Sequence, residues 1–158
     1  MHLYVIKANF MKLQILFIAT AFLTLSACST ARQAQKENSV MDQPLYGTKW
    51  SLKKINESGN SQSVETKAFI RFDEMKKSAG GNGSCNSFGS SLTIEDNNLR
   101  FSNIFSTKMY CEAVQSTENS YLSLLAKVDR FKITGEVLSL YFSDVVILEF
   151  SAEDISAL

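Results

Sequence analysis

Between residues 45 and 150, apolar and polar positions follow the pattern of short β-strands. Apolar residues alternate with polar ones, and turn residues separate the alternating segments, which is the signature of strands with one buried face. Gly135-Glu136 lies between two such segments and predicts a two-residue hairpin turn. The pattern predicts six to eight antiparallel strands. The apolar positions are Trp50, Leu52, Ile70, Phe72, Leu92, Ile94, Leu99, Phe101, Phe131, Ile133, Leu138, Leu140, Phe142, Val146, Leu148 and Phe150.

One segment, residues 111–131, departs from this alternation and predicts an amphipathic helix of three to four turns packed against the sheet. Its apolar positions at helical spacing are Val114, Tyr121, Leu125 and Val128. Glu118 and Lys127 are expected on the opposite, polar side. Closed antiparallel sheets avoid exposed edges. We therefore expect a mainly β (α+β) domain, in which a small barrel-like sheet carries one amphipathic helix.

The first 27 residues are typical of a bacterial signal peptide. Lys7 and Lys12 precede an uncharged apolar run, residues 13–25, which is shorter than the ~20 residues that a membrane span needs. The run ends in Leu-Ser-Ala-Cys, residues 25–28, which resembles a lipobox. This resemblance implies cleavage before Cys28 and lipid attachment to that cysteine. A non-lipidated signal peptide or a short N-terminal anchor is the alternative.

Residues 28–44 are polar, lack an apolar period and contain the only proline, Pro44. They predict a flexible tether. Residues 45–158 then form one domain that is long enough to have its own core. We expect an exported lipoprotein of the bacterial cell envelope, held at the outer membrane by the lipid on Cys28.

The composition narrows the available chemistry. The only histidine is His2, which lies in the expected signal peptide, so the mature protein would lack the base of Ser-His-Asp and Cys-His catalysis. It would also lack the commonest transition-metal ligand, and we expect neither a metal nor a cofactor. The 16 basic and 16 acidic residues balance and form no basic stripe, so nucleic acid is not an expected partner.

Two adjacent acid pairs, Asp73-Glu74 and Glu95-Asp96, are the remaining catalytic candidates. Two carboxylates are the catalytic groups of many glycoside hydrolases. Adjacent residues on a strand face opposite ways, however, and both pairs fall where a strand meets a turn. Solvated turn residues are therefore the favoured interpretation.

Four short motifs, in order, resemble the META domain family, which includes HslJ-like envelope proteins. The family pattern runs G-x-W-x-L, G-C-N-x-(F/Y), T-(R/K)-M-x-C and E-x-x-(F/Y)-x-x-x-L, and Ser84 stands where the family often has glycine. The resemblance covers about residues 45–150. It implies a compact, mainly β fold with one helix, envelope placement, links to stress or antibiotic tolerance, and no established catalytic residues. The matching residues are Gly47, Trp50, Leu52, Cys85, Asn86, Phe88, Thr107, Lys108, Met109, Cys111, Glu118, Tyr121 and Leu125.

Cys85 and Cys111 are the two cysteines that remain once Cys28 carries lipid. An even pair in an exported protein predicts a disulfide. The predicted hairpin between them, residues 92–101, returns the chain and brings its two flanks together. A reactive thiol at either position is the alternative.

These observations favour a lipid-anchored, non-enzymatic envelope protein of META type that acts through binding or structural support. Its protein or small-molecule partner is not identified by the sequence. One alternative is a lipocalin-like carrier of a small apolar ligand, which needs an interior pocket of about 300 Å³ or more. The other is a carboxylate-based hydrolase, which needs two acids converging in one cleft. Aromatic residues could line such a pocket or fill the core; they are Trp50, Tyr110, Tyr121 and Tyr141.

Overall fold

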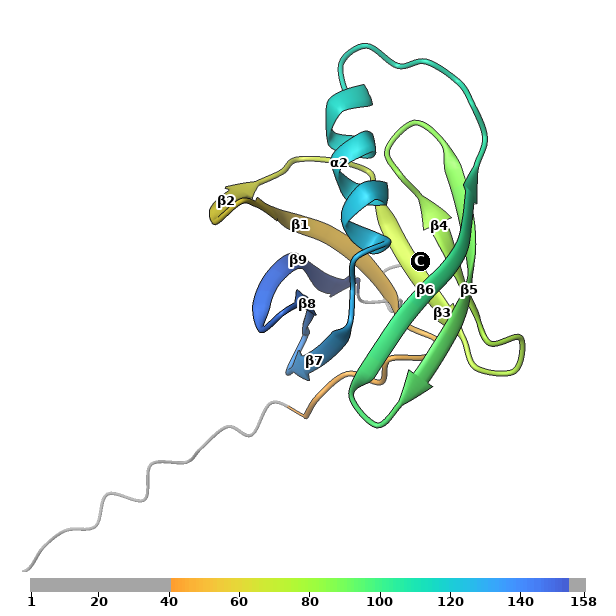
Figure 1. Ribbon diagram of the computed structural model, residues 1–158, viewed down its shortest axis with the longest axis vertical. Coiled ribbons are helices and arrows are strands. Elements are labelled where there is room, and N and C mark those ends of the chain that lie inside the picture. The colour runs from red at the N-terminus through yellow and green to blue at the C-terminus, as the bar shows by residue number, and fades with distance from the viewer. Residues whose placement is uncertain (1–40, 154–158) are drawn as a thin grey trace, which may run out of the picture. The chain divides into compact units, whose positions relative to one another are not determined.

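The computed structural model describes residues 41–153 (Figure 1), which belong to one compact unit. The expected signal peptide and Cys28 lie outside these residues. In chain order the elements are β1 (Lys49–Glu57), β2 (Asn60–Ser63), β3 (Phe69–Asp73), β4 (Ser78–Asn82), β5 (Ser87–Glu95), β6 (Asn98–Ser106), α2 (Gln115–Leu125), β7 (Arg130–Thr134), β8 (Val137–Phe142) and β9 (Val145–Glu153).

The strands form one antiparallel sheet that closes into a ring. Each strand from β3 to β8 pairs with the next along the chain, and β1 pairs with both β3 and β9. Strand β2 pairs only with β1. The ring is not a regular barrel, because β6 and β7 share the single register pair Asn98–Arg130. A mainly β fold with one helix in the described region is confirmed, with one strand more than predicted.

Helix α2 connects β6 to β7, the two strands that diverge, and packs against β1 and β9 (Figure 1). Its Tyr121, Leu124 and Leu125 are buried. The ring of Tyr121 meets Phe88 of β5 edge-on, with centroids 5.6 Å apart, and lies 5.9 Å from Phe150 of β9. The helix therefore adds its buried face to the core formed by the strands.

Side chains fill the interior of the ring. The indole N–H of Trp50 donates to the Leu45 carbonyl at 3.1 Å, which satisfies its one polar atom within the core. Complete burial of a Leu, Ile or Phe side chain stabilises the fold by ~1.5–3 kcal/mol relative to exposure. Buried side chains thus point into the interior in which a lipocalin-like carrier would hold its ligand. The largest fully buried side chains are Trp50, Tyr121, Phe150, Leu52, Ile70, Leu99, Leu125, Leu138, Leu140 and Leu148.

The glycine-rich segment, residues 80–91, contains more regular structure than the sequence predicts. It includes the end of β4 and the first part of β5, which pair with each other. A Cβ on Gly81 would collide with the main-chain carbonyl of Phe69, and one on Gly80 would lie 2.9 Å from the Phe88 carbonyl oxygen. Only glycine allows the neighbouring strands to approach this closely.

Two expected side-chain orientations are wrong. Glu118, expected on the polar side of the helix, is only 2% exposed, because main-chain and side-chain N–H groups surround its carboxylate. Phe142, expected on the buried face of its strand, is 45% exposed. The extra residue at the β8–β9 register shift is Ile147 of β9, so the shift leaves the alternation of β8 unchanged. Phe142 is the last residue of β8 and lies beyond its last buried residue, Leu140.

Residues 42 and 43, at the end of the expected tether, are hydrogen-bonded to the turn between β7 and β8. The Gln43 N–H donates to the Gly135 carbonyl at 2.9 Å, and the Gly135 N–H donates to Asp42 Oδ1 at 2.6 Å. The chain therefore enters the domain at the β7–β8 turn.

Candidate functional site

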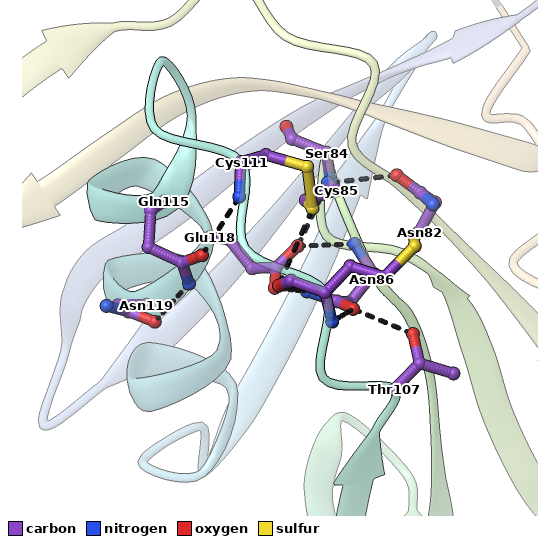
Figure 2. The surroundings of a disulfide bond; sticks show 10 residues. Asn82, Ser84, Cys85, Asn86, Thr107, Cys111, Gln115, Glu118 and Asn119 are labelled. Atoms are coloured by element: carbon purple, nitrogen blue, oxygen red, sulfur yellow. Dashed lines mark hydrogen bonds between the residues drawn. A yellow bond between two sulfur atoms is a disulfide. The ribbon is translucent and has the colours of Figure 1, made fainter.

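A disulfide joins Cys85 to Cys111, with an Sγ–Sγ distance of 2.01 Å and Cα atoms 5.9 Å apart (Figure 2). Cys85 lies between β4 and β5, and Cys111 precedes α2. The predicted crosslink is thus present, and its Cα separation falls within the usual range. It ties the glycine-rich connection to the start of the helix.

Glu118, in the first turn of α2, points from the helix toward this connection (Figure 2). Its Oε2 accepts the N–H groups of Cys85 at 3.0 Å and of Asn86 at 2.7 Å. Its Oε1 accepts Asn86 Nδ2 at 2.6 Å. A Cβ on Gly83 would lie 2.8 Å from Glu118 Cγ, so glycine at that position leaves room for the carboxylate.

Two opposing effects act on the ionisation of Glu118. Burial raises its pKa, but the N–H groups of Asn86 and Cys85 stabilise the carboxylate and hold the pKa below its ordinary value, with a smaller contribution from Lys108. Hydrogen bonds to the charged form lower the pKa of an acid in this way. Glu118 is therefore ionised at neutral pH, and acts as a hydrogen-bond acceptor.

The side-chain amide of Asn86 uses all of its hydrogen-bonding capacity. Its Oδ1 accepts Thr107 Oγ1 at 2.8 Å and the Met109 N–H at 2.7 Å. Its Nδ2 donates to the Met109 carbonyl at 2.9 Å and to Glu118 Oε1. An amide offers two donors and two acceptor positions, and all four are filled.

The structure thus brings together six motif residues from three separate stretches of the chain. We call them the motif cluster: Cys85, Asn86, Thr107, Met109, Cys111 and Glu118. Five other motif residues are in the core: Trp50, Leu52, Phe88, Tyr121 and Leu125. Gly47 has φ +79° in the turn before β1. The side chain of Met109 points outward, and this residue is 61% exposed.

The buried position of Glu118 differs from the predicted one, although its spacing in the sequence indicates burial. Glu118, Tyr121 and Leu125 are spaced i, i+3 and i+7, which places all three on one face of a helix. Since Tyr121 and Leu125 are core residues, the same spacing indicates an inward-pointing carboxylate. The charge of glutamate suggested the opposite.

The acid pairs partly converge. Asp73, Glu74 and Glu95 line one groove of about 380 Å³ beside Tyr46 and β5. A hydrogen bond from the Lys76 N–H, 3.0 Å long, and an ion pair with the Lys76 ammonium hold the pKa of Asp73 below its ordinary value. A general acid needs a raised pKa, so Asp73 is not suited to donate a proton at neutral pH.

A second groove, of about 460 Å³, separates the end of β6 from α2. The chain segment after β6 forms one wall and the N-terminal half of α2 forms the other, with Asn86 and Glu118 of the motif cluster also contributing. The remaining lining residues are Ser106, Thr107, Lys108, Met109, Tyr110, Gln115, Asn119 and Leu122.

Neither a membrane-spanning helix nor a metal site was found between residues 41 and 153. No helix there is long and apolar enough to cross a membrane. No group of three or more His, Cys, Asp or Glu residues there is placed to hold a metal ion.

Comparisons with known proteins agree with the motifs. The model of the META domain matches residues 43–155. The chain is similar to a protein from Burkholderia xenovorans with an NMR structure, at TM-score 0.59 and 21% identity over 69% of this chain and 83% of that chain. A second NMR structure is similar at TM-score 0.51 and 19% identity, over 66% and 87% of the two chains. These two similarities concern the fold alone. No curated protein matches the chain.

Proposed function

The chain belongs to the META domain family, and on that premise we propose that it is a lipid-anchored, non-enzymatic protein of the bacterial cell envelope. In this proposal the domain binds a partner and supports the envelope under stress. The lipid on Cys28 holds it at the outer membrane, and the domain provides the binding surface.

The hydrogen bonds and the disulfide within the motif cluster support the proposal that the protein is not an enzyme. The carboxylate of Glu118 accepts three N–H groups, and the amide of Asn86 has no free position. The two thiols of the cluster form a disulfide. Acid, base and nucleophilic chemistry need groups that are free to react, so the cluster is suited to hold the structure together.

The buried side chains inside the ring argue against a carrier of a small apolar ligand. Trp50, Tyr121 and Phe150 are fully buried there together with seven aliphatic side chains. A ligand of ordinary size needs about 300 Å³ or more, and the two grooves described above lie on the surface instead.

The anchoring is tested by replacing Cys28 with serine and fractionating cells. A lipidated cysteine buries acyl chains at ~0.8 kcal/mol per methylene, so the Cys28→Ser protein should leave the membrane fraction and remain unprocessed at this position. The double variant Cys85→Ser/Cys111→Ser is the matched control and should stay with membranes. A Cys28→Ser protein that still fractionates with membranes would refute the lipid anchor.

Turnover assays test the non-enzymatic part. Purified protein is expected to leave ester, amide, phosphate and glycoside substrates unchanged. A hydrolytic activity that is lost on replacing Asp73, Glu74 or Glu95 would overturn the proposal. It would establish the groove that these three residues line as an active site.

A further inference from the structure

The segment that follows β6, residues 106–110, is held along only one of its edges. The Thr107 N–H donates to the Ser87 carbonyl at 3.0 Å. Two residues further on, the main chain of Met109 pairs with the Asn86 amide. The segment therefore continues the edge of β6 past the last residue of that strand.

The opposite edge of this segment is free. In an antiparallel ladder, successive residues direct their N–H and C=O groups to alternate edges. Since Thr107 faces β5, the main-chain groups of Ser106 and Lys108 face away from it. Within residues 41–153, neither the Ser106 N–H nor the Lys108 N–H has a hydrogen-bond partner. An unpaired strand edge is a template for another extended chain.

The free edge opens onto the 460 Å³ groove whose far wall is α2. Gln115 Nε2 donates to Asn119 Oδ1 at 3.0 Å, and Asn119 Nδ2 has no partner among the described residues. Asn119 therefore has a donor for a main-chain carbonyl of an occupant. The groove thus offers main-chain groups on one side and an amide on the other.

The accessible charge of the groove is positive. Only two charged residues line it. Glu118 is buried and fully hydrogen-bonded, whereas Lys108 is exposed and has no ion-pair partner in the part of the chain that the structure describes. An acidic side chain is the complement of this groove.

Two large apolar side chains that line the groove are exposed. Met109 is 61% exposed and Tyr110 77%. Together they form an apolar rim of the kind found at interaction sites. The chain enters the domain at the β7–β8 turn, and Figure 1 shows residues 107–114 at the other end of the domain. This edge therefore lies at the opposite end of the domain from residues 42 and 43.

We propose that this groove binds an extended, acidic segment of a partner polypeptide, which adds to the free edge of residues 106–110 as a further strand. Main-chain hydrogen bonds to Ser106 and Lys108 would give affinity, and the Lys108 ammonium and apolar rim would select side chains, as in other cases of strand addition. This inference rests on the proposed binding function and assigns it a site and a class of partner.

The test uses the full-length protein as its host processes it, solubilised in detergent, and a displayed library of random heptapeptides. Enriched peptides are synthesised, and hydrogen exchange of individual amides is measured with and without them. The proposal predicts peptides containing Asp or Glu. It also predicts at least tenfold slower exchange at the Ser106 and Lys108 amides in the complex.

Two variants distinguish the contribution of the main-chain N–H of Lys108 to peptide binding from the contribution of its side-chain charge. Lys108→Pro removes the outward N–H and should weaken binding at least tenfold. Lys108→Gln keeps that N–H and should weaken binding severalfold, with a smaller dependence on salt. The matched control Lys67→Gln, another exposed lysine, should bind as the wild type does. Unchanged thermal unfolding midpoints show that the variants fold.

Other outcomes would overturn the inference. If no peptide is enriched, or if bound peptides leave exchange at Ser106 and Lys108 unchanged, the edge is not the site. Protection that rises with protein concentration alone would assign the edge to a second copy of the chain. Protection by phosphatidylglycerol vesicles would assign it to a lipid surface. The fractionation and turnover assays test the proposed function independently of these results.

Discussion

The side chain of Asn86 pairs with the main chain of Met109 as a neighbouring strand would. Its Oδ1 accepts the Met109 N–H at 2.7 Å, and its Nδ2 donates to the Met109 carbonyl at 2.9 Å. The regular β5–β6 ladder ends at the pair Phe88–Ser106. The amide extends that ladder and fixes the segment whose outer edge is free.

Replacing Asn86 with alanine should lower the free energy of unfolding by about 2–4 kcal/mol. The change removes four hydrogen bonds and leaves buried partners unsatisfied, and each such loss costs about 1–3 kcal/mol before the site relaxes. Urea denaturation measures the effect. The control Asn60→Ala, on the exposed strand β2, should stay within about 0.5 kcal/mol of wild type. Equal effects at the two positions would contradict the role assigned to Asn86.

The contribution of Glu118 to stability should depend on pH. Hydrogen bonds to charged groups contribute about 1.5–3 kcal/mol, so Glu118→Gln should destabilise the protein by roughly that amount at pH 7. The pKa of Glu118 is lower in the folded than in the unfolded state, so its stabilising effect is present above the unfolded-state pKa. The effect is lost as pH falls through the folded-state pKa.

Chemical denaturation of both proteins between pH 7 and pH 3 checks this dependence. The difference in unfolding free energy between wild type and Glu118→Gln should shrink in the acid range. A difference that stays constant across the range would mean that Glu118 is not ionised in the folded protein.

Removing the disulfide should destabilise the domain by about 3 kcal/mol, because Cys85 and Cys111 close a loop with a sequence separation of 26 in the chain-entropy account. Denaturation of the Cys85→Ala/Cys111→Ala variant measures this loss. Thiol labelling of denatured, unreduced protein from its native compartment tests the bond itself. Two free thiols in that protein would rule out the crosslink.

Tyr121→Phe should be neutral or stabilising by about 1 kcal/mol. The hydroxyl of Tyr121 is buried and has no hydrogen-bond partner among the described residues, and burial raises its pKa well above the ordinary value. The phenylalanine ring preserves the contacts with Phe88 and Phe150 while it removes the unpaired group. A loss of more than about 1 kcal/mol in thermal or urea unfolding would show that the hydroxyl has a partner.

Sequence patterns predict the strands that bury apolar residues. β3, for example, alternates buried Ile70 and Phe72 with the exposed Arg71. They do not predict β2, whose four residues are all exposed, or β4, which contributes only Ala79 to the core. These strands depend on main-chain pairing with their neighbours, and apolar alternation does not report such pairing.

The candidate site was predictable in part. Cysteine counting and the intervening hairpin predict the Cys85–Cys111 bond, and the family motifs identify Asn86, Thr107 and Glu118. The hydrogen bonds among them are not visible in the sequence, because they depend on how the glycine-rich connection approaches α2. The free edge at Ser106 likewise follows only from the register of the β5–β6 ladder.

The central claim is that the motif residues form one structural cluster, and a double-mutant cycle between Asn86 and Glu118 tests it most directly. Unfolding free energies are measured for Asn86→Ala, Glu118→Gln and the double variant, with the surface pair Lys54–Glu149 as a control. Residues in one buried network couple by about 0.5–3 kcal/mol, whereas exposed ion pairs give about 0.2–1 kcal/mol. We predict a coupling of at least about 1.5 kcal/mol for Asn86 and Glu118; effects that add within about 0.5 kcal/mol would contradict the claim.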